Sequence, residues 1–121
     1  MAVKRIVANV AADQFESVKA FYCDILQMKV VMDFGWIVTV ASEVLSTPQL
    51  SFAHEGGSGT PVPDLSIEID NLDEVYQRAL AAGFPIEYGP VTEPWGVRRF
   101  YMRDPVGRLV NILSHDQAPV M

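Results

Sequence analysis

The fold of this chain is decided by residues 94–113, PWGVRRFYMRDPVGRLVNIL. Within residues 104–107, an aspartate, a proline and a glycine take the first, second and fourth positions of a four-residue turn, which is the pattern of a type I turn. The flanking residues are rich in β-branched and aromatic side chains, as hairpin strands are. The stretch therefore predicts a loop carrying Trp95, followed by a β-hairpin with strands at 97–103 and 108–114.

The same order of elements occurs on both sides of residues 55–61, a glycine-rich segment that we interpret as a flexible connection. Before it, the pattern predicts a strand at 4–10, a helix at 14–27, and strands near 29–33, 36–41 and 49–54. After it, the pattern predicts a strand at 64–70, a helix at 72–82, a strand near 86–91 and the two hairpin strands. Each side is therefore a βαβββ module, with module one at 1–54, a linker at 55–62, module two at 63–115 and a tail at 116–121.

Both predicted helices have an apolar face and a start signal. The apolar residues recur at helical spacing: Phe15, Val18, Tyr22, Ile25 and Leu26 in the first helix, and Leu72, Val75, Tyr76, Ala79 and Leu80 in the second. Asp13 precedes Glu16 by three residues and Asn71 precedes Glu74 in the same way, as in a capping box. Gly83 suits the end of the second helix.

The first strands of the two modules have one apolar and one polar face, because side chains alternate along a strand. The apolar faces carry Ile6, Ala8, Val10, Leu65, Ile67 and Ile69. The opposite faces carry Arg5, Val7, Asn9, Asp64, Ser66 and Glu68. Burying those charges against another sheet would be costly without partners, whereas a concave face that holds water or a polar ligand removes the conflict. We therefore expect an α+β fold with a curved, cup-shaped mixed sheet and the helices on its outer face.

The length, charge and cysteine content of the chain limit the kinds of protein it could be. The 121 residues fit one compact domain, and half of them are hydrophobic. A net charge of -6 argues against nucleic acid or an anionic membrane as a partner. The single Cys23 forms no internal disulfide, and no stretch is long enough to span a membrane. The short apolar run near the N-terminus favours a first strand over a secretory leader, so the default location is the cytoplasm.

Three local patterns together resemble the vicinal oxygen chelate superfamily, which includes glyoxalase I, bleomycin-resistance proteins and extradiol dioxygenases. They are FYCDIL at 21–26, LSIEIDNLD at 65–73, and the loop and turn of residues 94–107. The resemblance covers nearly the whole chain and implies paired βαβββ modules, a small-molecule ligand and a homodimer. One departure is Gln27, where members of the superfamily usually place a glycine after the helix, so this helix is expected to end differently.

The resemblance also implies positions for a divalent metal. They fall on Arg5 (on Val7 if the strand register slips by one residue), on Asp64, on Asn111, and on Gln49 or Leu50. Arginine stays protonated and is no ligand, and asparagine suits hard cations better than transition metals. We therefore expect no metal and no other cofactor. The alternative is a divalent metal, for which Asp64, His54 and His115 are the reserve candidate ligands.

The candidate ligand-binding residues lie on the polar strand faces, the aromatic loop and the hairpin. They are Arg5, Asn9, Asp64, Ser66, Glu68, Trp95, Arg98 and Asn111. Arg5 and Asp64 occupy equivalent positions in the two modules, and we hypothesise that they form an ion pair. The alternative is that each points to solvent at a strand end. Glu68 is the candidate catalytic base.

These residues predict a metal-independent protein that binds a small, partly aromatic ligand in the cup. One alternative is a metal-dependent lyase, isomerase or dioxygenase of the same superfamily. Another is a metal-free enzyme that uses Glu68 as base, with Arg5 or Arg98 stabilising an anion. A purely structural or partner-binding role predicts instead a cup filled by side chains. Fold membership alone does not choose among these.

Overall fold

The computed structural model describes residues 1–115, so the predicted tail at 116–121 lies outside the described residues. The chain divides between His54 and Glu55 into two compact units, here called the first and the second unit. Each contains one helical segment and one β-sheet, which confirms the predicted α+β class. No helix among residues 1–115 has the length and apolar character that crossing a membrane requires.

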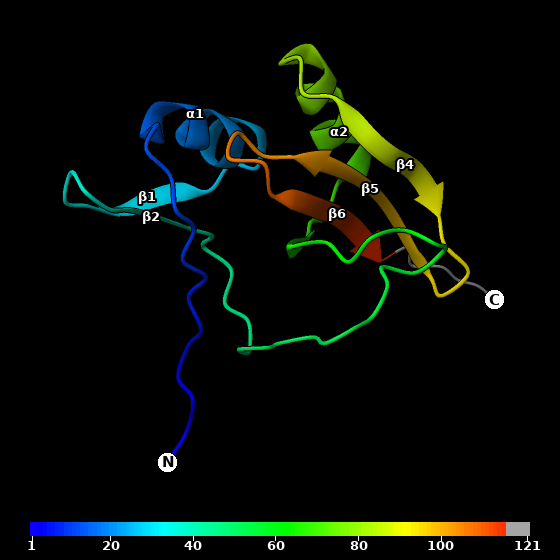
Figure 1. Cartoon of the computed structure of the whole chain (residues 1–121), viewed down its shortest axis with the longest axis horizontal. Helices are drawn as coiled ribbons and strands as arrows, with labels where there is room; N and C mark the ends of the chain where they lie inside the picture. Colours follow the sequence, from blue (N-terminus) through cyan, green and yellow to red (C-terminus); the bar gives the residue numbers. More distant parts are fainter. Residues whose placement is uncertain (116–121) are drawn as a thin grey trace. The chain divides into compact units, whose positions relative to one another are not determined.

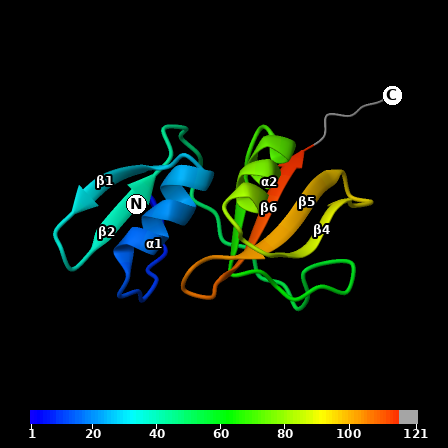
Figure 2. The ribbon, with the colours of Figure 1, turned by 90° about the horizontal axis from the view of Figure 1, so that it is seen from above.

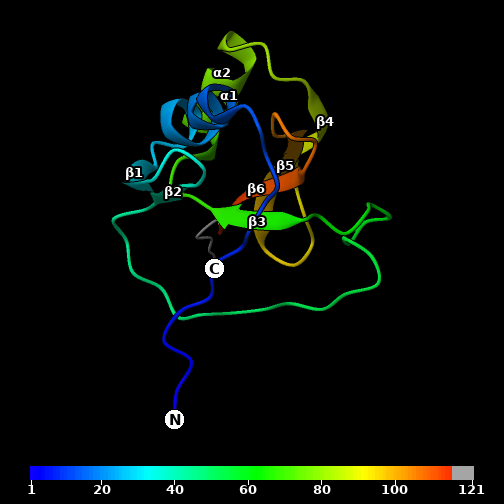
Figure 3. The ribbon, with the colours of Figure 1, turned by 60° about the vertical axis from the view of Figure 1, so that its left-hand side comes forward.

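The second unit is a four-stranded mixed sheet with one helix. Its strands are β3 (Leu65–Glu68), β4 (Ile86–Thr92), β5 (Val97–Arg103) and β6 (Leu109–His115), and its helix is α2 (Leu72–Ala81). The strand order is β3-β6-β5-β4, with β3 parallel to β6 and the other neighbours antiparallel (Figures 1 and 3). Every element predicted in this unit is present.

Helix α2 covers one face of this sheet (Figure 2). The Asn71 side chain accepts a hydrogen bond from the Glu74 N–H at 3.2 Å, which confirms the predicted cap. On the covered face the Tyr76 and Phe100 rings meet edge to face, with 5.4 Å between centroids. The apolar side chains buried in the helix and in these strands include Leu72, Val75, Ala79, Phe100, Met102, Val110 and Ile112. Their burial anchors the sheet on the helix.

The hairpin turn forms as predicted. The Gly107 N–H donates to the Asp104 carbonyl oxygen at 3.0 Å, which closes the turn between β5 and β6. The Asp104 carboxylate accepts hydrogen bonds from the Val106 and Arg108 N–H groups at 3.0 and 2.8 Å. The aspartate therefore satisfies the backbone of the turn, which is why this residue type starts such turns.

The first unit has a helix and a two-stranded antiparallel hairpin. Helix α1 (Phe15–Lys19) continues into the π-helical turn η1 (Ala20–Ile25), and β1 (Lys29–Asp33) pairs with β2 (Val38–Ala41). The predicted capping box is wrong, because Gln14 is the cap residue and makes no side-chain cap hydrogen bond. Gln27, after the helix, has a φ of 59°, so the chain adopts a left-handed conformation there without the glycine that favours it.

Two strands predicted in the first unit are wrong. Neither 4–10 nor 49–54 is a strand in residues 1–54, all of which the structure describes. Both segments have the alternating apolar pattern, and their apolar side chains, such as Ile6, Val10, Leu50 and Phe52, are exposed. Alternation predicts which face a side chain takes if a strand forms, whereas strand formation itself requires a backbone partner.

Candidate functional site

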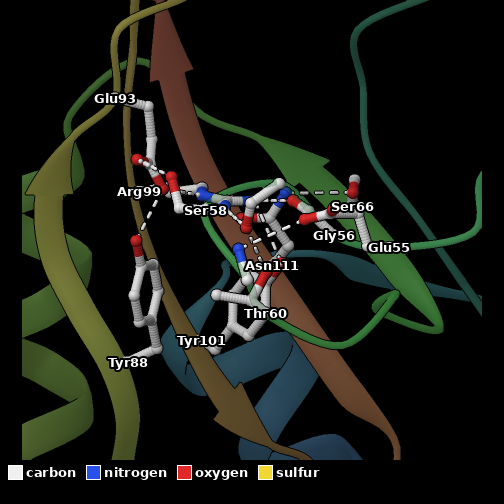
Figure 4. Close-up of polar contacts among 12 residues, drawn as sticks. Glu55, Gly56, Ser58, Thr60, Ser66, Tyr88, Glu93, Arg99, Tyr101 and Asn111 are labelled. Carbon is white, nitrogen blue, oxygen red and sulfur yellow. Dashed lines mark hydrogen bonds and ion pairs between the residues drawn. The ribbon is translucent and has the colours of Figure 1, made fainter.

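The face of the second unit's sheet opposite α2 carries a row of polar side chains (Figure 4). Phe100 on β5 contacts α2, so its neighbours Arg99 and Tyr101 point to the opposite face. The strand register places Asn111 beside Tyr101, and Ser66 beside Asn111. Two predicted ligand-binding residues, Ser66 and Asn111, therefore lie together on this face.

Asn111 is the most unusual residue of this row. It is only 7% exposed, and its Nδ2 donates a hydrogen bond to the Ser66 Oγ at 3.0 Å. Its Oδ1 is buried and has no hydrogen-bond partner among the described residues. A buried polar atom left without a partner costs about 1–3 kcal/mol. The Asn111 amide oxygen is thus a buried acceptor that the described residues leave without a hydrogen bond.

Glu68 and His115 form a pair at the ends of β3 and β6. The Glu68 Oε2 and His115 Nδ1 atoms lie 2.8 Å apart, and both side chains are largely exposed. Glu68 shares its face with Ser66, because the two residues are separated by one position on the same strand. His54 is exposed and belongs to the first unit.

Asp64 and Arg98 have contacts within the second unit that fix its structure. Asp64 Oδ2 accepts a hydrogen bond from the Leu109 N–H at 2.9 Å, and its backbone N–H donates to the Leu109 carbonyl at 2.8 Å. Arg98 binds Asp73 of α2 at 2.9 Å, which places it on the helix-covered face of the sheet. The proposed pairing of Asp64 with Arg5 remains a prediction.

A buried ion pair between Arg99 and Glu93, which no sequence pattern predicted, lies at the centre of the remaining polar cluster. Arg99 Nε lies 2.7 Å from Glu93 Oε2, and these side chains are 4% and 3% exposed. The Arg99 guanidinium also donates to the Gly56 and Gly57 carbonyls at 2.9 and 3.2 Å, and to the Tyr101 hydroxyl at 3.0 Å. Every side of this cation is therefore occupied by the protein itself.

The carboxylate of the pair is equally well satisfied. Ser58 Oγ and Tyr88 Oη each donate to Glu93 at 2.8 Å, in addition to Arg99. Burial by itself would raise the pKa of Glu93. The hydrogen bonds from Ser58, Tyr88 and Arg99, together with the Arg99 charge, outweigh it and lower the pKa below its ordinary value of 4.5. Glu93 is therefore held as a carboxylate.

Hydrogen bonds tie the glycine-rich segment to the rest of the second unit. The Gly56 N–H donates to the Thr60 carbonyl at 2.8 Å, and Arg99 holds the carbonyls of both Gly56 and Gly57. A Cβ on Gly56 would overlap the Pro61 carbonyl oxygen, and one on Gly57 would lie 2.6 Å from the Trp95 ring. These glycines serve close approach to the sheet and to Trp95.

Trp95 lies on this cluster and remains half exposed. The Arg99 guanidinium carbon is 5.1 Å from the Trp95 ring centroid, within cation–π distance. The ring is 52% exposed, although Gly57 and Arg99 support it from the protein side. The predicted aromatic loop therefore presents a supported ring at the surface of the second unit.

A separate cavity of about 370 Å³ lies within the first unit. Arg5, Val7 and Asn9 line it from the N-terminal segment, and these are the three residues that the alternation places on one face. Val31, Met32, Ile37 and Thr39 line it from the β1–β2 hairpin. Two predicted ligand-binding residues, Arg5 and Asn9, thus share one largely apolar cavity.

The donor set does not fit the divalent metal that the resemblance implies. Within residues 1–115, no group of three or more His, Cys, Asp or Glu side chains is placed to hold a metal ion. Asp64 is hydrogen-bonded to the backbone of β6, and His115 is hydrogen-bonded to Glu68. Of the other implied positions, Arg5 is no ligand and Asn111 is a poor one for transition metals. Gln49 is exposed in the first unit, where its Nε2 donates a hydrogen bond to Thr47 Oγ1 at 3.1 Å.

Comparison with known proteins identifies the family. The family model described as "Glyoxalase/Bleomycin resistance protein/Dioxygenase superfamily" matches residues 4–112. No match was found among proteins of curated function.

Several solved structures have the same fold. TnmS3, an antibiotic binding protein from Streptomyces sp. CB03234, is 19% identical with a TM-score of 0.67, over 96% of this chain and 97% of that one. TioX from Micromonospora sp. ML1 is 18% identical with a TM-score of 0.61, over 95% and 98%. A lactoylglutathione lyase from Agrobacterium tumefaciens is 20% identical with a TM-score of 0.62, over 93% and 92%. At these identities the likeness shows the fold.

Proposed function

Because this chain belongs to the glyoxalase/bleomycin resistance protein/dioxygenase superfamily, we propose that it binds a small, partly aromatic molecule without a metal ion. The observation that carries this proposal is the buried Asn111 Oδ1, which has no partner among the described residues. A ligand that donates a hydrogen bond to this oxygen would remove the cost of its burial. Ser66, on the neighbouring strand, offers a second polar contact on the same face.

The support for metal independence is the chemistry of the side chains at the implied metal-ligand positions. Arg5 and Asn111 occupy two positions where the resemblance implies metal ligands, and neither side chain suits that role. An antibiotic binding protein among the structural neighbours is consistent with a binding role for this scaffold. Trp95 would supply a flat contact surface for an aromatic ligand.

The test is a thermal-shift screen of aromatic and antibiotic-like compounds against the full chain in a chelator, followed by titration calorimetry of each hit. A ligand present at about 100 times its Kd stabilises the folded state by about 2.7 kcal/mol. We expect hits whose stabilisation is the same with and without chelator. Stabilisation that disappears in chelator, or a screen without a single hit, would overturn the proposal.

Variants of the polar face show whether a hit uses it. Asn111→Leu removes the unpartnered oxygen, so we expect weaker ligand binding together with an unchanged or higher free energy of unfolding. Ser66→Ala is expected to weaken binding to a lesser degree. The matched control is Ser114→Ala, because Ser114 lies on β6 on the face that α2 covers. Equal effects of Ser66→Ala and Ser114→Ala would contradict a ligand on this face.

A metal-free acid–base enzyme is the second candidate, and the Glu68–His115 hydrogen bond favours it. This candidate predicts turnover of a bound compound that Glu68→Gln abolishes and that chelator leaves unchanged. A bound compound recovered chemically unaltered after long incubation excludes enzymatic turnover of that compound.

We also propose that the chain forms a homodimer. Light scattering during size-exclusion chromatography tests this.

A further inference from the structure

Arg5 differs from every other arginine of the chain. The chain has six arginines, and Arg78, Arg98, Arg99, Arg103 and Arg108 each lie within 4.0 Å of a carboxylate oxygen. Within the first unit, Arg5 has neither an ion pair nor a hydrogen bond. In a chain with 15 acidic residues and a net charge of -6, no carboxylate of its own unit pairs with this cation.

The surroundings of Arg5 are apolar. It lines the cavity of the first unit together with Val31, Met32 and Ile37, and with the neutral polar residues Asn9 and Thr39. The cavity volume, about 370 Å³, falls at the lower end of the range of small-molecule sites, which is about 300–1,000 Å³. A guanidinium at the border of an apolar cavity pairs best with a ligand that has an apolar body and one anionic group.

We propose that this cavity binds a small aromatic carboxylate, with Arg5 as the partner of the carboxylate and the β1–β2 side chains as the apolar wall. The inference rests on the proposed small-molecule binding and adds a binding site within the first unit, together with the charge of the ligand that this site would take. Asn9 and Thr39 supply further hydrogen bonds to the carboxylate or to a polar substituent. Arg5 stands where the resemblance implies a metal ligand, so the chain itself supplies a positive charge there.

The test uses 2-naphthoate and its neutral analogue 2-naphthamide as probes of the ¹⁵N-labelled full chain, with backbone amide shifts recorded by NMR at pH 7. We expect 2-naphthoate to shift amides of residues 5–9 and 31–39, because these segments line the cavity. A charge-assisted hydrogen bond to a guanidinium corresponds to about tenfold in affinity, so 2-naphthamide should bind about tenfold more weakly.

Two neighbouring variants separate the Arg5 contact from the overall charge. Arg5→Gln should weaken 2-naphthoate binding by about tenfold and leave 2-naphthamide binding unchanged. Lys4→Gln removes the same charge one residue earlier, on a side chain that does not line the cavity. Its effect should be less than about twofold, because exposed charges without a direct contact are screened by salt. Arg5 is exposed and makes no hydrogen bond or ion pair within the first unit, so its variant should fold normally.

Each other outcome overturns the inference. Equal binding of the two probes, equal effects of Arg5→Gln and Lys4→Gln, or shifts confined to the second unit would each remove Arg5 as the anion partner. If neutral aromatic hits bind and 2-naphthoate does not, the anionic class is wrong and the proposed function stands. If no compound of either class binds, both proposals fail.

Discussion

Two arginines, one in each unit, show how differently the same side chain is used. Arg99 is buried in the second unit against Glu93, two backbone carbonyls and the Tyr101 hydroxyl. Arg5 lies at a cavity of the first unit and has no anionic partner within that unit. Because the protein itself makes every polar contact of Arg99, these contacts stabilise the folded chain. The contacts that Arg5 lacks are the ones a ligand would make.

The two units also differ in their glycines and in the residue that follows each helix. In the second unit, Gly56 and Gly57 allow a close approach and Gly83 follows α2 with a φ of 83°. In the first unit, Gln27 takes the corresponding left-handed conformation with a full side chain. The left-handed residue that follows the helix is therefore a glycine in the second unit and a glutamine in the first.

Removing Arg99 should have the largest effect. Arg99→Met leaves the Glu93 carboxylate buried without its cation, and loss of one partner of a buried pair costs about 3–5 kcal/mol. The control is Arg103→Met, because the Arg103–Glu87 pair is half exposed and such pairs contribute at most about 1 kcal/mol. Urea unfolding measures both. Equal losses in the free energy of unfolding for the two variants would contradict a structural role for the buried pair. Glu93→Gln is a milder change to the same pair.

Filling the space at Gly56 should have the next largest effect. Gly56→Ala places a methyl group against the Pro61 carbonyl oxygen, and overpacking of this kind costs up to about 3 kcal/mol. Gly59→Ala is the control, since nothing lies within 4 Å of its Cβ and only its φ of 75° opposes a side chain. That variant should lose about 1 kcal/mol. If the loop were flexible, the Gly56 variant would lose no more stability than the Gly59 variant.

Acid should weaken the buried pair next. The pKa of Glu93 is lower in the folded chain than its ordinary value of 4.5. The stabilisation is therefore complete above the unfolded pKa and is lost as the pH falls through the folded one. Unfolding free energies measured from pH 7 to pH 3 should fall more steeply for the wild type than for Glu93→Gln. Parallel pH profiles would show that Glu93 has no depressed pKa.

The helix ends should give the smallest effect. Gln27→Gly relieves a left-handed conformation that costs an ordinary residue about 1 kcal/mol, so we expect stabilisation of up to that amount. Gly83→Ala introduces the same strain after α2 and should destabilise the chain by about 1 kcal/mol. Thermal unfolding of both variants checks the opposite signs. A change of the same sign in both would indicate that the two helix ends are not comparable.

Local chemistry explains which parts of the fold the sequence predicts. The β5 strand at 97–103, the turn at 104–107 and the Asn71 cap depend on neighbouring residues and were predicted correctly. The strands at 4–10 and 49–54 were predicted wrongly, because a strand needs a distant backbone partner that alternation does not reveal.

The candidate site was likewise predicted only in part from the sequence. The alternation of Arg5, Val7 and Asn9 predicts a shared face, and the three residues line one cavity. The role of Arg99 was missed, because its partners Glu93, Gly56 and Gly57 come together only in three dimensions. A buried pair in which every polar atom is satisfied leaves no spacing signal in the sequence.

The most direct test of the account is the metal content of tag-free protein, measured by elemental mass spectrometry before and after incubation with Zn, Ni, Mn and Fe(II). The central claim is that the chain binds ligands through its own side chains, with Arg5 at the cavity of the first unit and Asn111 on the polar face of the second unit, where the resemblance implies metal ligands. The account predicts that no metal is retained after dialysis and that aromatic ligands bind equally well in chelator. A near-stoichiometric metal that survives dialysis would contradict it.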